Sequence, residues 1–246
     1  METDHWHILK NFTRARIAMG RAGSALPTYE VLNFRMAHAL ARDAVYSVLN
    51  IEQLSRSLEA LGLKSVCVHS RAENRNDYLL NPDKGRSLDL ISVKKLQSLN
   101  NLEVDLCIII ADGLSADAVN QHAAKVIELL TVRLPNWRIA PVVLSKQARV
   151  ALSDPIGELL RAEISLILIG ERPGLSSPNS MGAYITYHPK TGNTDEKRNC
   201  VSNIWPHGLS YEFAAFKLAY LLNQMRTLQI SGVNLKDDFD PSFIAE

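Results

Sequence analysis

The sequence predicts an α/β protein, in which a mostly parallel β-sheet carries helices on both faces and follows a helical N-terminal region. Two segments, 104–111 and 164–169, are apolar on nearly every side chain, which is typical of buried parallel strands. Amphipathic stretches alternate with such segments, as crossover helices between parallel strands do. Hydrophobic residues make up 46% and charged residues 22%, an ordinary composition for a folded domain. We therefore expect a helical region over 1–62 and an α/β domain over 63–246.

The N-terminal region contains two predicted helices. Between Pro27 and about Asn50, apolar residues recur mostly at spacings of three or four, which predicts a long helix with one apolar face. These residues are Val31, Phe34, Ala37, Ala41, Ala44, Val45 and Val48. A second helix over 51–61 should stop at Gly62, a residue suited to a helix C-terminus.

The rest of the chain alternates between predicted strands and helices. Four core strands are expected over 64–69, 104–111, 139–144 and 164–169, with a fifth and more exposed strand over 182–187. Helices are expected over 115–132, 154–162 and 209–228, and the polar stretch that ends near Asn101 is helical or irregular.

Charge and cysteine content exclude several classes of protein. The chain has 27 Lys and Arg against 26 Asp and Glu, so its net charge of +1 argues against a general nucleic-acid binder. No apolar run approaches the roughly 20 residues that span a bilayer. Cys67, Cys107 and Cys200 are odd in number and far apart, which indicates free thiols and a reducing, cytoplasmic environment.

Two loops follow predicted core strands at the sheet edge where α/β proteins bind ligands. They cover 111–115 and 169–178, and the second combines several Gly, Pro and Ser residues with Glu171 and Arg172. A ligand site and a plain connection with a surface ion pair are both compatible with this loop. A third candidate is the basic run over 13–21, which suits either a phosphate or acidic partner or a solvated turn.

Recognised catalytic motifs are missing from the sequence. Neither loop carries GxGxxG or GxxxxGK[ST], which disfavours a nicotinamide or ATP enzyme. The spacing of His188, Cys200 and His207 matches no zinc motif, so no metal site is expected. No GxSxG marks a nucleophilic serine, and for Cys200 a packed thiol is a better interpretation than a nucleophile.

Five blocks in order along the chain resemble the small (light) subunit of ethanolamine ammonia-lyase. They cover 13–23, 26–44, 112–116 (DGLSA), 170–178 (GERPGLSSP) and 198–204 (RNCVSNI). The resemblance extends from about residue 12 to 237, and the last two blocks are specific in combination.

The resemblance implies an adenosylcobalamin-dependent carbon–nitrogen lyase that converts ethanolamine to acetaldehyde and ammonia by a radical mechanism. It implies six large and six small subunits, with substrate and catalytic residues on the large subunit. The small subunit would be Rossmann-like and would bind the cobalt-containing cofactor between the two chains. The family's cobalamin contacts carry over to Val150, Glu171 and Cys200, and no catalytic residue or metal ligand is assigned to this chain.

Two features of the chain depart from the family pattern. The family usually reads Gln-Gly-Arg-Val where this chain has Gln147, Ala148, Arg149 and Val150, so Ala148 would shift the contact at Val150 if that glycine needs a positive φ. Some members carry a longer N-terminal extension that targets a bacterial microcompartment. Only about a dozen residues precede the first matched block here, so a microcompartment location is possible without a clear targeting extension.

Two alternative functions stay open on the sequence. One is a non-catalytic assembly subunit whose cobalamin contacts are incidental. The other is a free-standing Rossmann-like enzyme that uses a nucleotide, which the missing phosphate motifs count against. Mixing the chain with its large subunit and adenosylcobalamin would separate the first alternative from the leading hypothesis.

Overall fold

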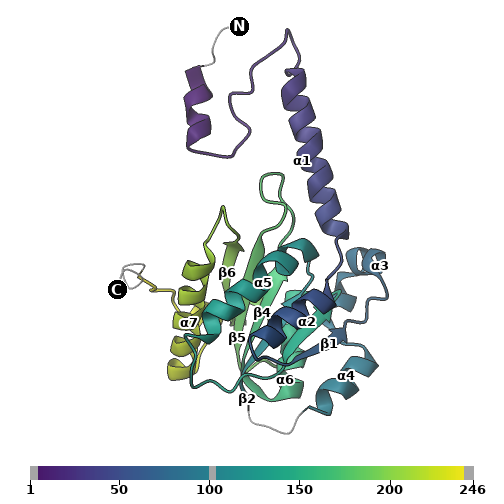
Figure 1. The fold of residues 1–246 in the computed structure, drawn as a ribbon, viewed down its shortest axis with the longest axis vertical. Coiled ribbons are helices and arrows are strands. Elements are labelled where there is room, and N and C mark those ends of the chain that lie inside the picture. The colour runs from purple at the N-terminus through teal and green to yellow at the C-terminus, as the bar shows by residue number, and fades with distance from the viewer. Residues whose placement is uncertain (1–4, 100–103, 241–246) are drawn as a thin grey trace.

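A six-stranded sheet forms the centre of the computed structural model, which describes residues 5–99 and 104–240 (Figure 1). The strand order is β1-β3-β2-β4-β5-β6. The strands are β1 (Ser65–His69), β2 (Val104–Ala111), β3 (Val142–Lys146), β4 (Ala162–Gly170), β5 (Met181–Tyr187) and β6 (Arg198–Ile204). The first four run parallel, whereas β5 and β6 are antiparallel to their neighbours. The predicted α/β class with a mostly parallel sheet is confirmed.

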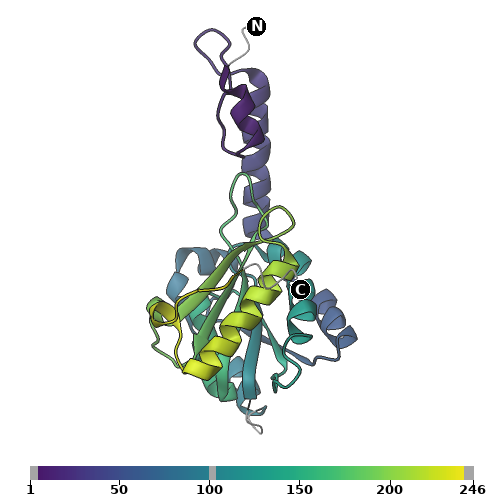
Figure 2. The same ribbon diagram turned by 90° about the vertical axis from the view of Figure 1, so that its left-hand side faces the viewer.

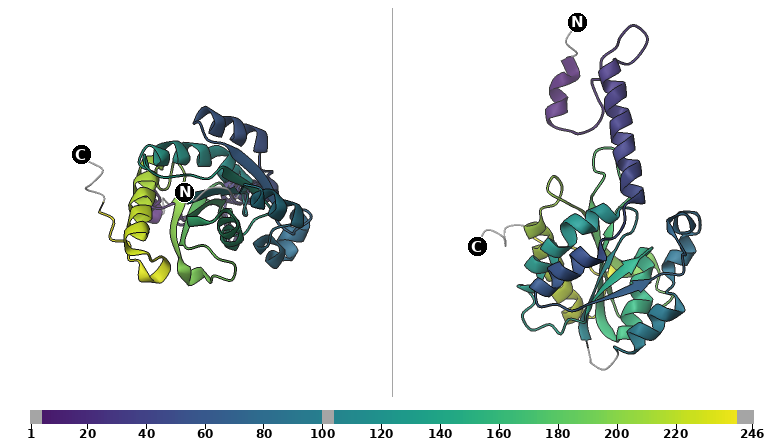
Figure 3. Two further views of the ribbon diagram at one scale, coloured as in Figure 1. Left: turned by 90° about the horizontal axis from the view of Figure 1, so that it is seen from below. Right: turned by 45° about the vertical axis from the view of Figure 1, so that its right-hand side comes forward.

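Helices cover both faces of this sheet (Figures 1 and 3). They are α1 (Thr28–Tyr46), α2 (Ile51–Ala60), α3 (Arg75–Leu80), α4 (Leu90–Gln97), α5 (Ala116–Thr131), α6 (Ser153–Leu160) and α7 (Tyr211–Leu228). Helices α2, α5 and α7 share one apolar core, and α4 and α6 share the other. Short 3-10 turns occur at His5–Asn11, Pro82–Arg86, Val150–Leu152, Asp195–Lys197 and Gly232–Asn234. No helix among the described residues is long and apolar enough to cross a membrane.

The antiparallel part of the sheet differs from the sequence-based expectation. The strand expected to be exposed, β5, is buried except at Tyr184 and Tyr187, because it pairs on both sides. The expectation was therefore wrong on its exposure. No strand was expected over 198–204, but this segment forms the edge strand β6. Its exposed Cys200, Ser202 and Asn203 give it no apolar run, so the pattern did not reveal a strand.

Several element ends also move. Strand β3 begins at Val142 rather than Ile139, since Pro141 has no N–H to donate to a neighbouring strand. The last helix begins at Tyr211 rather than at 209, because the Ser210 hydroxyl accepts the backbone N–H of Phe213 and so caps it. The polar stretch contains α3 and α4, and its expected end near Asn101 lies outside the described residues.

Residues 5–46 form an N-terminal arm that projects from the sheet domain (Figures 1 and 2). The arm consists of the 3-10 segment His5–Asn11, a connection and the long helix α1. The base of the helix is fastened to the body, because the Arg75 Nε donates to the carbonyl of Val45 at 2.7 Å and the backbone N–H of Asp117 donates to the Ser47 hydroxyl at 3.0 Å. The predicted apolar face is partly covered, since Ala44 is buried and only Phe34 and Val48 of its seven residues are exposed.

Candidate functional site

The two loops that follow β2 and β4 meet at the carboxyl edge of the parallel strands. The backbone N–H of Leu114 donates to the carbonyl of Gly170 at 2.9 Å, and the Ser115 hydroxyl donates to the carbonyl of Pro178 at 3.3 Å. Gly113 has a φ of 54°, a left-handed conformation that glycine adopts at little cost. The loops that the sequence singled out therefore form one structural unit.

A cleft of about 400 Å³ opens beside these loops. Side chains and backbone from both loops and from three further segments line it. The lining residues are Tyr78, Gly113, Leu114, Arg149, Val150, Ile169, Gly170, Glu171, Arg172 and Tyr184. The structure thus brings Val150 and Glu171, two of the three proposed contact residues, into one cleft. Such a place, outside the carboxyl ends of parallel strands, is where open α/β sheets bind ligands.

The Asp112 carboxylate holds the loop that carries Val150. Its two oxygens accept the backbone N–H groups of Gln147 at 2.8 Å and Ala148 at 3.0 Å. Burial raises the pKa of Asp112, while these two N–H groups and the Arg75 guanidinium, 3.8 Å away, favour its ionised form. Within this loop the left-handed conformation, with a φ of 54°, belongs to Gln147 and not to Ala148. Ala148 is fully buried and does not line the cleft, so its methyl group leaves the wall at Val150 free.

Tyr78 lines the cleft and contacts two arginines. The guanidinium carbons of Arg75 and Arg149 lie 4.9 and 4.4 Å from the centre of its ring, within cation–π distance. Its hydroxyl donates to the carbonyl of Ala148 at 2.9 Å. The Nε of Arg149 is buried without a hydrogen-bond partner, which leaves an unsatisfied donor in the cleft wall.

Glu171 is held in place by the end of β6. Its Oε1 accepts the backbone N–H of Asn203 at 3.2 Å, and its own N–H donates to the carbonyl of Ser180 at 3.0 Å. No ion pair between Glu171 and Arg172 occurs in the part of the chain that the structure describes. The carboxylate is therefore positioned at the cleft rather than engaged in a surface ion pair.

Cys200 lies next to the cleft rather than on its wall. It faces Tyr184 across the β5–β6 pair, and Tyr184 is the residue that lines the cleft. Desolvation raises the pKa of the Cys200 thiol, and the nearby Glu171 carboxylate adds to this effect, while a hydrogen bond with Tyr184 opposes it. A raised pKa disfavours the thiolate and so argues against a nucleophile. The side chain is exposed in this chain, so the expectation of a packed thiol was wrong for the chain by itself. All three cysteines are free.

Comparisons with known proteins match almost the whole chain. The family model described as ethanolamine ammonia-lyase light chain matches residues 3–236. The chain belongs to this family. It is 49% identical over 238 residues to the ethanolamine ammonia-lyase small subunit of Pseudomonas aeruginosa (strain LESB58), covering 95% of this chain and 87% of that protein. It is 47% identical over 242 residues to that of Xanthomonas campestris pv. campestris (strain B100), covering 96% and 89%. The resemblance stated from the sequence is confirmed.

Family membership and cleft geometry together identify residues that the sequence analysis missed. Tyr78 and Tyr184 were not singled out, and Arg149 was named only as a neighbour of Val150. Tyr184 lies in the strand expected to be exposed, and its place opposite Cys200 depends on a strand pairing that the sequence does not reveal. Within residues 5–99 and 104–240 no group of three His, Cys, Asp or Glu side chains is arranged to hold a metal ion.

Proposed function

We propose that this lyase subunit binds adenosylcobalamin in the cleft at the carboxyl edge of its sheet. With the large subunit, the complex would convert ethanolamine to acetaldehyde and ammonia. The observation that carries the proposal is the convergence of Val150 and Glu171 on one cleft, with Cys200 paired across the strands with Tyr184 of its wall. Membership of the ethanolamine ammonia-lyase family favours a cofactor site here over a plain loop connection.

The lining residues suit the chemistry of a corrin. A corrin has an apolar ring edge and peripheral amides, and the cleft combines the apolar Leu114, Val150 and Ile169 with the carboxylate of Glu171 and the unsatisfied Nε of Arg149. Pockets that enclose a drug-sized ligand measure roughly 300–1,000 Å³. A cofactor larger than such a ligand fits a cleft of about 400 Å³ only in part. This favours a cofactor shared between two chains.

The residues of this chain would bind and orient the cofactor. The Glu171 carboxylate would accept a hydrogen bond from a peripheral amide, Val150 and Tyr184 would pack on the cofactor, and Cys200 would lie beside Tyr184. When bound, adenosylcobalamin supplies the radical chemistry, so this chain needs no nucleophile or general base of its own. The protonated thiol of Cys200 is consistent with such a role.

The large subunit would complete the site. The relatives are named small subunits, which implies a larger partner, and we propose the assembly of six large and six small chains that the family resemblance suggests. We expect the isolated chain to release no acetaldehyde from ethanolamine in the presence of adenosylcobalamin. A rigorously pure preparation that turned over ethanolamine would contradict this assignment.

Glu171→Gln is expected to weaken adenosylcobalamin binding to the assembled complex roughly ten- to a hundredfold. The substitution keeps the shape of the side chain and an oxygen for the Asn203 N–H, but it removes the charge on the acceptor of a hydrogen bond that is worth about 1.5–3 kcal/mol when that acceptor is ionised. A spectroscopic titration of the complex with adenosylcobalamin measures the change. Arg172→Gln is the matched control, because it also removes one charge from the cleft, but a positive one from the next residue. Unchanged affinity of the Glu171 variant in an intact complex would remove this residue from the site.

Cys200→Ser and Cys200→Trp are expected to separate packing from chemistry at this position. The serine variant keeps the volume beside Tyr184 and should retain most of the activity of the reassembled enzyme. The tryptophan variant places a much larger side chain beside Tyr184 and should block cofactor docking at the cleft. Acetaldehyde release and cobalamin absorbance are the two measurements. Loss of turnover in the serine variant with the cofactor still bound would instead make the thiol catalytic.

A further inference from the structure

The N-terminal arm presents an apolar stripe that stays exposed among the residues that the structure describes. Its members share one face of α1, with spacings of three, four and four residues, and each exposes between 52% and 71% of its surface. They are Tyr29, Leu32, Met36 and Leu40. Contiguous exposed apolar patches of this kind mark interaction surfaces.

The physics of helices indicates that the arm needs a partner. Most of the stability of a protein helix comes from packing an apolar face, and isolated helices are marginal in water. Helix α1 has 19 residues, of which only Ala44 is buried within its own chain. Figure 2 shows the helix standing clear of the sheet domain along most of its length. Another chain must therefore supply the packing surface.

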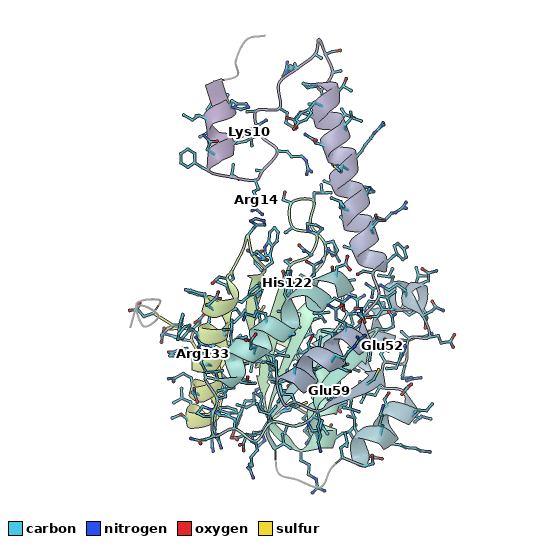
Figure 4. All side chains as sticks on the ribbon, viewed as in Figure 1. Lys10, Arg14, Glu52, Glu59, His122 and Arg133 are labelled. Atoms are coloured by element: carbon cyan, nitrogen blue, oxygen red, sulfur yellow. The ribbon has the colours of Figure 1, made fainter. Side chains whose placement is uncertain are left out.

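Charge decides between a second copy of this chain and a different partner. Residues 5–46 contain six Lys or Arg and two Asp or Glu, a net charge of +4, although the whole chain carries only +1. Arg35 and Arg42 are exposed on α1 itself, and Figure 4 shows Lys10 and Arg14 on the segment beside it. Two such arms packed on each other would bring like charges together, which is unfavourable. An acidic rim around an apolar groove would complement the arm.

The position of the arm connects it with the cleft. The base of α1 is fastened to the N-terminus of α5, which directly follows the loop that ends β2, so the arm leaves the body at the carboxyl edge of the parallel strands (Figure 1). A second contact comes from the connection before α1. There the guanidinium carbon of Arg14 lies 5.0 Å from the ring centre of Trp205, which follows β6. A partner that covers the cleft is therefore in reach of the arm as well.

We propose that the stripe Tyr29, Leu32, Met36 and Leu40 docks, as a helix in a groove, into an apolar groove with an acidic rim on the large subunit. The proposal rests on the proposed function, because that function supplies the larger partner. It adds the surface that holds the partner and the chemistry of the complementary groove.

The test compares full-length variants for binding to the purified large subunit. The triple variant Leu32→Gln, Met36→Gln and Leu40→Gln keeps helix-compatible residues and should bind at least about a hundredfold more weakly, because it removes three apolar side chains from the interface. Arg35→Glu with Arg42→Glu should also weaken binding and reduce its dependence on salt. The matched control, Leu90→Gln with Ile91→Gln, changes side chains that are 80% and 78% exposed on α4 and should stay within about twofold of the parent.

The outcomes separate this proposal from the proposed function. Circular dichroism and thermal unfolding of the triple variant should match the parent, since the stripe lies outside the core. At concentrations that force assembly, the triple variant should bind adenosylcobalamin as the parent does. Unchanged affinity of the triple variant for the large subunit would overturn the docking proposal and leave the cofactor site standing. Loss of a parent homodimer in the triple variant, seen by sedimentation of the chain alone, would assign the stripe to a second copy and also overturn it.

Discussion

Arg198→Met is expected to lower the free energy of unfolding by about 3–5 kcal/mol, because it leaves the Asp154 carboxylate buried without its partner. Both side chains of the pair are 2% exposed, and the guanidinium grips the carboxylate with bonds of 2.9 and 2.6 Å. It also donates to the Thr186 hydroxyl at 3.2 Å and to the Asn193 carbonyl at 3.3 Å. The pair joins the start of β6 to α6, so we expect the variant to loosen the strand that carries Cys200 and Asn203. Urea denaturation monitored by circular dichroism measures the change.

The pH dependence of the Arg198 variant gives an independent check. Burial raises the pKa of Asp154, and Arg198 opposes that shift in the parent, so the variant raises this pKa further. A carboxyl whose folded-state pKa is raised destabilises the protein as pH increases above its unfolded value of about 3.9. The loss in free energy of unfolding of the variant, relative to the parent, should therefore be largest near neutral pH and become smaller toward pH 4.

Two further variants test whether the buried charge is the cause. Adding Asp154→Leu to the methionine variant should recover most of the lost stability, since an apolar pair of similar size replaces a buried ion pair at little cost. Arg56→Met removes the exposed pair with Glu52 and should cost less than about 1 kcal/mol. An equal loss in the Arg198 and Arg56 variants would contradict the proposed role of burial.

Gly170→Ala is expected to cost at least about 3 kcal/mol and to weaken cofactor binding more than tenfold. A Cβ at this position would overlap the carbonyl oxygen of Ser115 and lie 2.7 Å from that of Asp112. Both are backbone atoms of the loop after β2, which cannot turn aside as a side chain does. The loop must move away from β4, and the cleft wall formed by Gly113 and Leu114 moves with it.

The control for this glycine lies four residues along the same loop. At Gly174 an added Cβ would have the Ser177 hydroxyl oxygen, 3.1 Å away, as its nearest atom, and that side chain is able to rotate. Gly174→Ala should therefore change the free energy of unfolding by less than about 1 kcal/mol. Thermal unfolding and a cofactor titration of the complex compare the two variants. If the Gly170 variant were as stable as the Gly174 variant, the loop after β2 could move away from β4 without loss of stability, which would contradict this prediction.

The parallel half of the fold was predictable from local pattern. Strands β2 and β4 are buried on both faces, so nearly every residue of each is apolar, and an unbroken apolar run is a signal within a few neighbouring residues. The loops after these strands then follow as the ligand edge, which is how Glu171 and the 112–115 loop were selected. The family resemblance added Val150 and Cys200, which no local pattern marks.

The pairing of β6 and the exposure of the N-terminal arm could be learned only from the tertiary structure. Edge strand β6 is half exposed, and only its register against β5 places Cys200 beside Tyr184 and the Asn203 N–H on Glu171. The long helix was expected from its apolar face, but that pattern does not identify the surface that covers the face. Among the described residues the expected face of α1 is covered only in part and Ala44 alone is buried, because covering surfaces come from the packing of distant segments or of another chain.

The physical reason for this division is the range of the interactions. Composition, helix periodicity and buried apolar strands express short-range preferences, so the class of fold and the order of its parallel elements are already present in the amino-acid sequence. The Arg198–Asp154 pair spans 44 residues, and the bond from the Asn203 N–H to Glu171 spans 32. Contacts of that length exist only once the sheet is assembled, and they determine which side chains share the cleft and which faces stay open to a partner.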